Sequence, residues 1–186
     1  MLYLVPRWYI TLLGLVGIER LRELAISRRN SRTAGGPPSA SGTYPVIVAA
    51  HVGLLVLPPI EIAFARRKIQ RRTLWLALVF AATGLRWWSI STLGAAWNVR
   101  AQVPEGFAPV THGPYRYIRH PNYLALIVEF VALPMAGGAW MSAVALSLVN
   151  GLALWGRIRA EEAQLNRSAA YCTGFQRKAR LIPRIF

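Results

Sequence analysis

Residues 123–155, YLALIVEFVALPMAGGAWMSAVALSLVNGLALW, form a long apolar stretch of the 186-residue chain. As one helix it would be about 50 Å long, too long for a single crossing of a bilayer core about 30 Å thick. Pro134 and the pair Gly137-Gly138 lie near its middle, and both residue types interrupt helices. We therefore predict a helical hairpin that crosses the membrane over 123–136 and returns over 139–155.

The composition of the whole chain also indicates an integral membrane protein. Hydrophobic residues make up 54% of the chain and charged residues 16%, whereas a soluble domain carries about 25% charged residues. This excludes a disordered chain and argues against a soluble enzyme. The single cysteine, Cys172, excludes a disulfide scaffold. The length predicts one domain, residues 1–186.

Three further apolar runs bring the expected number of membrane-spanning helices to about five. They cover residues 2–18, 44–65 and 74–97. A cleaved signal peptide is the disfavoured alternative for the first run, because no basic segment precedes it.

Less apolar segments connect these runs. We predict an amphipathic helix over 19–32, a flexible linker over 31–43, a loop over 98–122 and a tail over 156–186. Residues 1–97 then hold three N-terminal spans, and 123–155 the hairpin.

The net charge of +15 distributes unevenly over this topology. Five spans place segments 19–43, 98–122 and 156–186 on one side, with 15 of the 22 basic residues, and leave 6 on the other. The positive-inside rule puts the more basic side in the cytoplasm. Nucleic acid is the alternative partner for such a charge, but anionic lipid headgroups account for it in a membrane protein.

The loop just before the hairpin, THGPYRYIRHPNY at 111–123, is rich in polar and aromatic side chains. Its two X-Pro steps hold the backbone extended or turned, which leaves backbone N–H groups and side chains free to face a ligand. The alternative is an interfacial loop whose Tyr and Arg side chains anchor at lipid headgroups. Composition alone leaves both interpretations open.

A second candidate group, RIRAEE at 157–162, follows the hairpin. Arg157 and Glu161 are four residues apart and share a helix face, in the less favourable order for a helix ion pair. A surface pair would contribute well under about 1 kcal/mol. We interpret these residues as ligand-binding, and span counting places them on the same side as the 98–122 loop.

The sequence HGPYRYIRHPNY, a hairpin, RIRAEEAQL and a closing RLIP together resemble the isoprenylcysteine carboxyl methyltransferase (ICMT) family. The N-terminal ERLRELAISRRN is similar to small bacterial members, which include methyltransferases of long-chain alkylpyrones. The resemblance implies an all-α integral membrane enzyme of the bacterial inner membrane with its site facing the cytoplasm. It also implies S-adenosylmethionine as methyl donor and a lipophilic or prenylated acceptor.

The resemblance also implies roles for individual residues. The cofactor would contact Val110, Gly113, Tyr115, His120, Pro121, Asn122, Tyr123 and Glu161. Arg119 and Arg157 would face the acidic oxygen of the acceptor and, with Glu161, form the catalytic group. The tail departs from the family pattern: where relatives often carry Phe-Gly and a Tyr pair, this chain has Arg167-Ser168, then Tyr171 and Phe175.

The residue chemistry agrees with methyl transfer without a metal. His51, His112 and His120 are scattered and lack metal-ligand spacing. An already ionised carboxylate or acidic enol needs no general base, so the arginines would orient it rather than activate it.

Several polar residues fall within or beside the apolar runs. We expect His51 to be a packed polar residue, and Glu19 and Glu61 to reach water near span ends. Glu129 lies deep in the hairpin, where it could pair with Arg86 from the third apolar run or line the substrate cavity, and we favour the pair.

Two alternatives remain open on the sequence. Sterol reductases, which use NADPH, carry a similar His-Pro-Asn-Tyr stretch but need more spans than this chain offers. The second alternative is a non-enzymatic lipid-binding protein, for which Arg157 and Glu161 would be dispensable.

Overall fold

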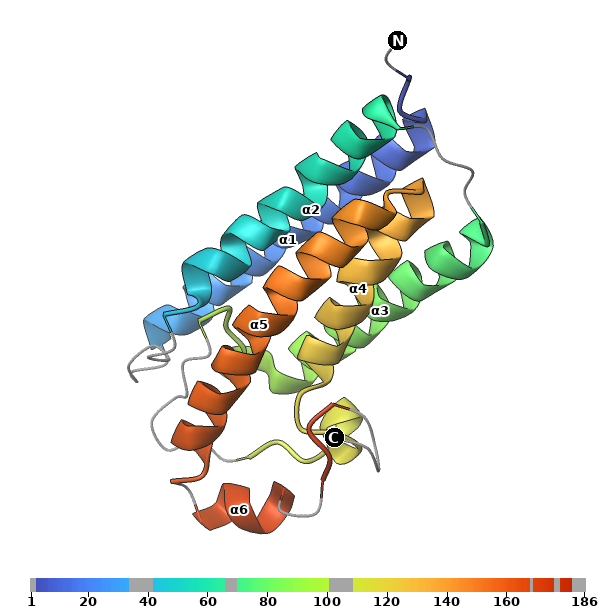
Figure 1. Ribbon diagram of the computed structural model, residues 1–186. Helices are drawn as coiled ribbons and strands as arrows, with labels where there is room; N and C mark the ends of the chain where they lie inside the picture. Colours follow the sequence, from blue (N-terminus) through green and yellow to red (C-terminus); the bar gives the residue numbers. More distant parts are fainter. Residues whose placement is uncertain are drawn as a thin grey trace.

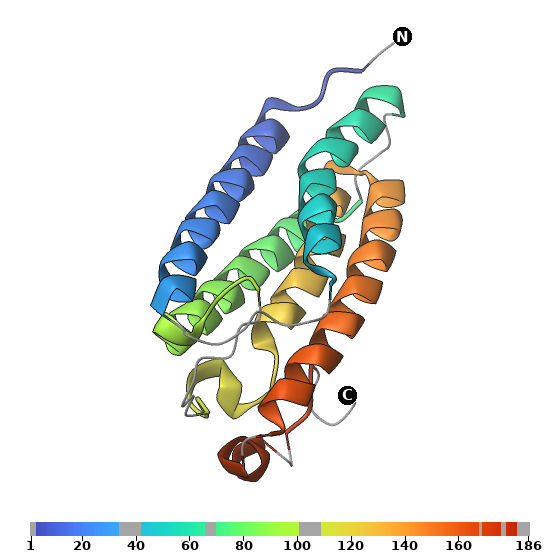
Figure 2. The same ribbon diagram turned by 90° about the vertical axis from the view of Figure 1, so that its left-hand side faces the viewer.

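The computed structural model describes residues 3–33, 42–65, 70–100, 109–167, 169–175 and 178–181. Most of these residues are helical and none of them forms a strand, which confirms the predicted all-α class. The helices are α1 (Arg7–Thr33), α2 (Tyr44–Phe64), α3 (Arg72–Leu93), α4 (Pro121–Gly137), α5 (Trp140–Leu165) and α6 (Ala169–Phe175), with short 3-10 turns η1 (Gly94–Ala96) and η2 (Gly113–Arg116). Figures 1 and 2 show α1, α2, α4 and α5 running along the long axis, with α6 at one end.

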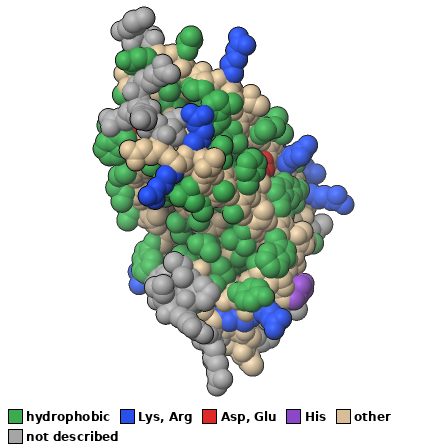
Figure 3. Space-filling model, turned by 90° about the vertical axis from the view of Figure 1, so that its right-hand side faces the viewer, with side chains coloured by type: hydrophobic (Ala, Val, Ile, Leu, Met, Phe, Trp, Pro, Cys, Tyr) green, Lys and Arg blue, Asp and Glu red, His purple; other side chains and the backbone are tan. Residues whose placement is uncertain are grey.

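Three helical segments are long and apolar enough to cross a membrane: Tyr44–Phe64, Arg72–Ala96 and Trp140–Leu165. The apolar α4 is shorter, at 17 residues. Large apolar side chains face outward from these helices, for example Phe80 on α3 and Leu152 on α5, which is 77% exposed. Figure 3 shows hydrophobic side chains spread along one face of the molecule. A lipid environment accounts for this surface, as expected for an integral membrane protein.

The predicted hairpin is present as α4 and α5. Pro134 lies in the last turn of α4, and Gly138, with a φ of 85°, ends the helix in the left-handed conformation that glycine adopts without strain. The Gly138 N–H donates to the Met135 carbonyl at 3.1 Å. Both boundaries differ from the prediction, however. Helix α4 begins at Pro121, and α5 continues to Leu165, so Arg157 and Glu161 belong to the hairpin rather than to a separate tail.

Glu61 is half-buried near the end of α2, and it also stabilises the start of α5. Its carboxylate accepts hydrogen bonds from the Met141 N–H at 3.1 Å and from the Ser142 N–H and hydroxyl at 2.7 Å. A negative charge here satisfies N–H groups that lack partners within the helix.

The N-terminal segment is one continuous helix, α1, rather than a span followed by a separate amphipathic helix. Charged residues do not interrupt it because they find partners inside the bundle. Arg20 donates to Glu23 on α1 at 2.8 Å and to Glu129 on α4 at 3.0 Å. Glu19 is also largely buried in the bundle, which corrects the expectation that it reaches water. Residues 34–41 of the predicted linker lie outside the described residues.

The helices pack closely at the end opposite α6. The Tyr9 hydroxyl of α1 donates to the Leu133 carbonyl of α4 at 3.1 Å. A Cβ on Gly137 would lie 2.6 Å from Cζ of Tyr9, so this contact requires glycine. Tyr9 and Phe130 are fully buried in this core.

Candidate active site

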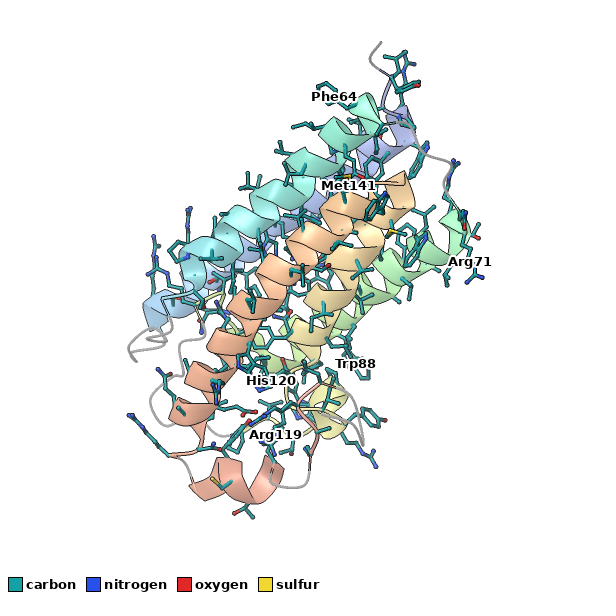
Figure 4. The ribbon with its side chains drawn as sticks, in the orientation of Figure 1. Phe64, Arg71, Trp88, Arg119, His120 and Met141 are labelled. Carbon is teal, nitrogen blue, oxygen red and sulfur yellow. The ribbon has the colours of Figure 1, made fainter. Side chains whose placement is uncertain are left out.

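A cavity of about 460 Å³ opens between the loop before α4, the second half of α5 and the C-terminal segment. Most of the predicted site residues line it. Those that do are Val110, Tyr115, Arg119, His120, Asn122, Tyr123, Arg157 and Glu161. In Figure 4, Arg119 and His120 lie at the α6 end of the molecule, far from Phe64 and Met141.

The loop and the C-terminal segment are held together by backbone hydrogen bonds. Ile118 and Ala179 form a parallel bridge. The N–H groups of Arg119 and His120 donate to the carbonyls of Ala179 and Arg180, each at 2.9 Å. The structure therefore brings together the two segments that span counting assigns to one side.

Tyr123 connects Arg157 to Glu161. The Tyr123 hydroxyl donates to Glu161 and accepts a hydrogen bond from Nε of Arg157 at 2.9 Å. Arg157 also donates through Nη2 to the Val99 carbonyl and is only 4% exposed. Arg157 is therefore a buried residue with fixed orientation, not one half of a surface ion pair.

Glu162 fixes the His-Pro loop, a role that the sequence analysis did not assign. Its carboxylate lies 3.2 Å from Nε2 of His120, accepts a hydrogen bond from Nε of Arg180 at 2.9 Å, and lies 3.6 Å from Arg119. The His120 ring in turn stacks on Tyr123. Adjacent helix residues point in different directions, so Glu161 lines the cavity while its neighbour anchors the loop.

Aromatic side chains of α6 complete this end of the cavity. Tyr171 and Phe175 stack at 4.7 Å between ring centroids and pack against Tyr115 and Leu165. The tail therefore covers the cavity despite its departure from the family pattern. Burial, followed by the negative charge of Glu161, raises the pKa of Tyr115, and burial raises the pKa of Tyr171. Both phenols stay neutral at physiological pH.

Two of the predicted residues do not line the cavity. Gly113 has a φ of 57°, and a Cβ there would lie 2.7 Å from Oγ1 of Thr92 on α3. Pro121 is buried at the first turn of α4. Both shape the backbone that carries Tyr115, His120 and Asn122.

This architecture agrees with a comparison of the sequence with known protein families. The model of the isoprenylcysteine carboxyl methyltransferase (ICMT) family matches residues 75–167. The chain belongs to the ICMT family. It is also similar to the uncharacterized protein YpbQ of Bacillus subtilis (strain 168), with 29% identity over 160 residues that cover 83% of this chain and 94% of YpbQ. Membership of this methyltransferase family supports an enzymatic role in the membrane.

In this ICMT family member the cavity continues beyond the predicted residues, between α1 and α2. Apolar side chains of both helices line it there, among them Leu21, Leu24, Val48, Val52 and Leu55. Leu21 and Val52 are more than half exposed on the outer surface, so this part of the cavity borders the lipid.

The sequence analysis assigned no role to Arg20 and Glu23 in the deeper wall, and the partner of Arg86 differs from the prediction. Arg86 pairs with Glu23 through Nη2 at 2.6 Å, and Glu129 pairs with Arg20 instead of Arg86. The spacing of Arg20 and Glu23, almost one helical turn apart, is the signal that could have located this pair. His51 is a packed polar residue as predicted: its ring lies edge-on to Phe130, and Nδ1 is 2.7 Å from the Ile47 carbonyl oxygen.

Proposed function

We propose that the protein transfers the methyl group of S-adenosylmethionine to a carboxylate or acidic enol oxygen of a lipophilic acceptor, such as an isoprenylcysteine or a long-chain alkylpyrone. The observation that carries the proposal is one continuous cavity. Its α6 end is lined by polar and aromatic groups of the loop, α5 and the tail, and its other end by apolar side chains next to the lipid. A water-soluble donor and a membrane-dissolved acceptor could meet only in such a place.

The residues at the α6 end fit S-adenosylmethionine. Oδ1 of Asn122 is buried, has no hydrogen-bond partner among the described residues, and belongs to a side chain that lines the cavity. With the Glu161 carboxylate it offers acceptors for the amino and hydroxyl groups of this cofactor. Tyr171 and Phe175 offer apolar faces for its adenine ring. We propose that Tyr115, His120, Asn122, Tyr123 and Glu161 hold the cofactor, with Val110 beside it.

The chain's own residues would orient the acceptor. When bound, S-adenosylmethionine supplies a methyl group on a positively charged sulfur, which passes to the acceptor oxygen as the sulfur–carbon bond breaks. Arg157 and Arg119 are the cations that line this part of the cavity and would align the acceptor anion. An ionised acceptor needs no general base. Charge is lost as anion and cation combine, so the dry, aromatic-covered wall favours the reaction.

The apolar half of the cavity would hold the acceptor's tail. Leu21, Val48 and Val52 border the lipid, so a hydrocarbon chain could enter sideways from the bilayer. Burial of apolar groups contributes about 0.8 kcal/mol per methylene relative to water. We further propose that the protein lies in the bacterial inner membrane with the α6 end in the cytoplasm, where S-adenosylmethionine is made.

Ligand-dependent thermal stability of the purified protein in detergent tests this proposal. S-adenosylhomocysteine at about 100 times its dissociation constant should stabilise the fold by about 2.7 kcal/mol. NADPH serves as the control ligand and should have no effect. Mass spectrometry of lipid extracts from cells with and without the protein should then reveal a product one methylene group heavier than its precursor. Stabilisation by NADPH alone would overturn the proposal in favour of a reductase.

A further inference from the structure

Five charged side chains of α1, α3 and α4 form a cluster within the helical bundle. They are Glu19, Arg20, Glu23, Arg86 and Glu129. Each side chain is at most 12% exposed, and short ion pairs connect them all. We refer to these five residues as the buried charge cluster.

Helix packing alone does not account for the cluster. A buried ion pair is costly to desolvate, and apolar residues of similar size often stabilise a fold equally well. Arg20, Glu23 and Arg86 also line the cavity, beside His51. The cluster is thus part of the wall that a ligand meets.

Three buried polar atoms of the cluster have no hydrogen-bond partner within the described part of the chain. Two are donors, Nε of Arg20 and Nη1 of Arg86, and the third is an acceptor, Oε1 of Glu19. A buried N–H group without an acceptor is costly, and such groups in native proteins call for a partner. An oxygen atom of a ligand in this part of the cavity would supply one, with Arg20 the more accessible of the two arginines.

The charges of the cluster indicate which kind of ligand oxygen it would bind. Three carboxylates face two guanidinium groups, so a further anion would be repelled. A neutral carbonyl or hydroxyl oxygen can accept a hydrogen bond from arginine without adding charge.

The cluster lies deeper in the bundle than Tyr123, because Glu129, the ion-pair partner of Arg20, follows Tyr123 by six residues on α4, a rise of about 9 Å along the helix. Tyr123 holds the Arg157 and Glu161 side chains at the α6 end. One cavity connects this end with the buried charge cluster.

We propose that the buried charge cluster is a second recognition site, which binds a neutral carbonyl or hydroxyl oxygen carried by the acceptor about 9 Å from its reacting oxygen. This inference rests on the proposed function, because it assumes that the acceptor's acidic group lies near Arg157. It specifies an acceptor with an oxygenated chain rather than a plain hydrocarbon tail.

Three synthetic acids test the proposal without any variant. Octadecanoic acid is compared with its 8-oxo and 16-oxo derivatives; in an extended chain a ketone on the eighth carbon lies about 9 Å from the carboxyl group. Each acid is titrated into the full-length protein in detergent with saturating S-adenosylhomocysteine, and the rise in melting temperature gives its affinity. The 8-oxo acid should bind at least about tenfold more tightly than the other two.

A double variant then assigns the preference to the cluster. Arg20→Gln with Glu129→Gln replaces one ion pair by neutral amides and leaves the net charge unchanged. The preference for the 8-oxo acid should disappear, while S-adenosylhomocysteine binds as before. Glu61→Gln is the matched control, since it alters a carboxylate that bonds to another helix outside the cavity wall and should leave the preference intact.

The outcomes separate this proposal from the proposed function. Suppose that S-adenosylhomocysteine binds but the three acids bind equally or not at all. The cluster then has only a structural role, and the inference is wrong. A preference that survives in the double variant also overturns it. If S-adenosylhomocysteine itself does not bind, the proposed function fails and the inference falls with it.

Discussion

At the scale of single residues, the Tyr123 hydroxyl is the group that connects the two halves of the candidate site. Arg157 and Glu161 share a helix face, as their spacing predicts, and both form a hydrogen bond with this hydroxyl. A sequence pattern gives the residues on one helix face. It does not give a partner from another helix, because that partner depends on how the helices pack.

This connection predicts coupled effects on cofactor affinity. Tyr123→Phe removes the hydroxyl that orients Glu161, and Glu161→Gln removes the carboxylate charge, so each variant should bind S-adenosylhomocysteine more weakly. The double variant should lose less affinity than the two losses combined, with a coupling of about 0.5–3 kcal/mol measured by titration calorimetry. Strictly additive losses would mean that the hydroxyl does not act through Glu161.

Arg157 should affect methyl transfer more than cofactor binding. Arg157→Lys keeps the positive charge but replaces the two guanidinium nitrogens that bond the Tyr123 hydroxyl and the Val99 carbonyl by a single nitrogen without the planar geometry. We expect kcat with a lipophilic acid to fall at least about tenfold, as for other lost charge-assisted hydrogen bonds, with little change in S-adenosylhomocysteine affinity. Arg159→Lys, at an exposed position of the same helix, is the control and should retain its rate. Equal rates in both variants would remove Arg157 from the site.

At the scale of elements, local signals predicted the hairpin well. Gly138 ends α4 by its own backbone preference, which a sequence reveals directly, whereas Pro134 is accommodated within the last turn of the helix. The continuity of α1 could not be predicted in this way. Arg20 and Glu23 look like the end of a membrane helix until Arg86 and Glu129 are known to neutralise them from other helices.

Glu61 should contribute to the stability of α5 without affecting the candidate site. Glu61→Gln removes the charge that accepts two N–H groups at the start of this helix, and we expect a loss of about 1 kcal/mol of stability. The melting temperature in detergent should fall by a few degrees. Ser142→Ala, which removes one of the three hydrogen bonds, should cause a smaller fall. A change in S-adenosylhomocysteine affinity would contradict a purely structural role.

At the scale of the whole molecule, the two ends of the bundle differ in character. One end is closed by tight contacts such as Tyr9 with Gly137, and the other carries the loop, the tail and the cavity. Span counting predicted that the loop and tail share a side, because the hairpin between them was expected to cross the membrane and return. It could not predict the deep part of the cavity, whose wall combines Arg20 of α1, His51 of α2 and Arg86 of α3 through packing alone.

The charge distribution predicts which end faces the cytoplasm. The site end includes basic residues of α1's second half, the loop and the tail, and the positive-inside rule places it inside. In a Cys172→Ser background, His112→Cys marks the site end and Arg71→Cys the opposite end, where Figure 4 shows Arg71. Both positions are exposed, so a membrane-impermeant maleimide can reach either one from its own side.

In intact bacterial spheroplasts, Arg71→Cys should be labelled and His112→Cys protected until the membrane is permeabilised. The basic residues around 66–72 oppose this orientation, so the result depends on the balance between 15 charges and 6. Labelling of His112→Cys in intact spheroplasts would place the cavity mouth outside, away from the cytoplasmic S-adenosylmethionine that the proposed reaction requires.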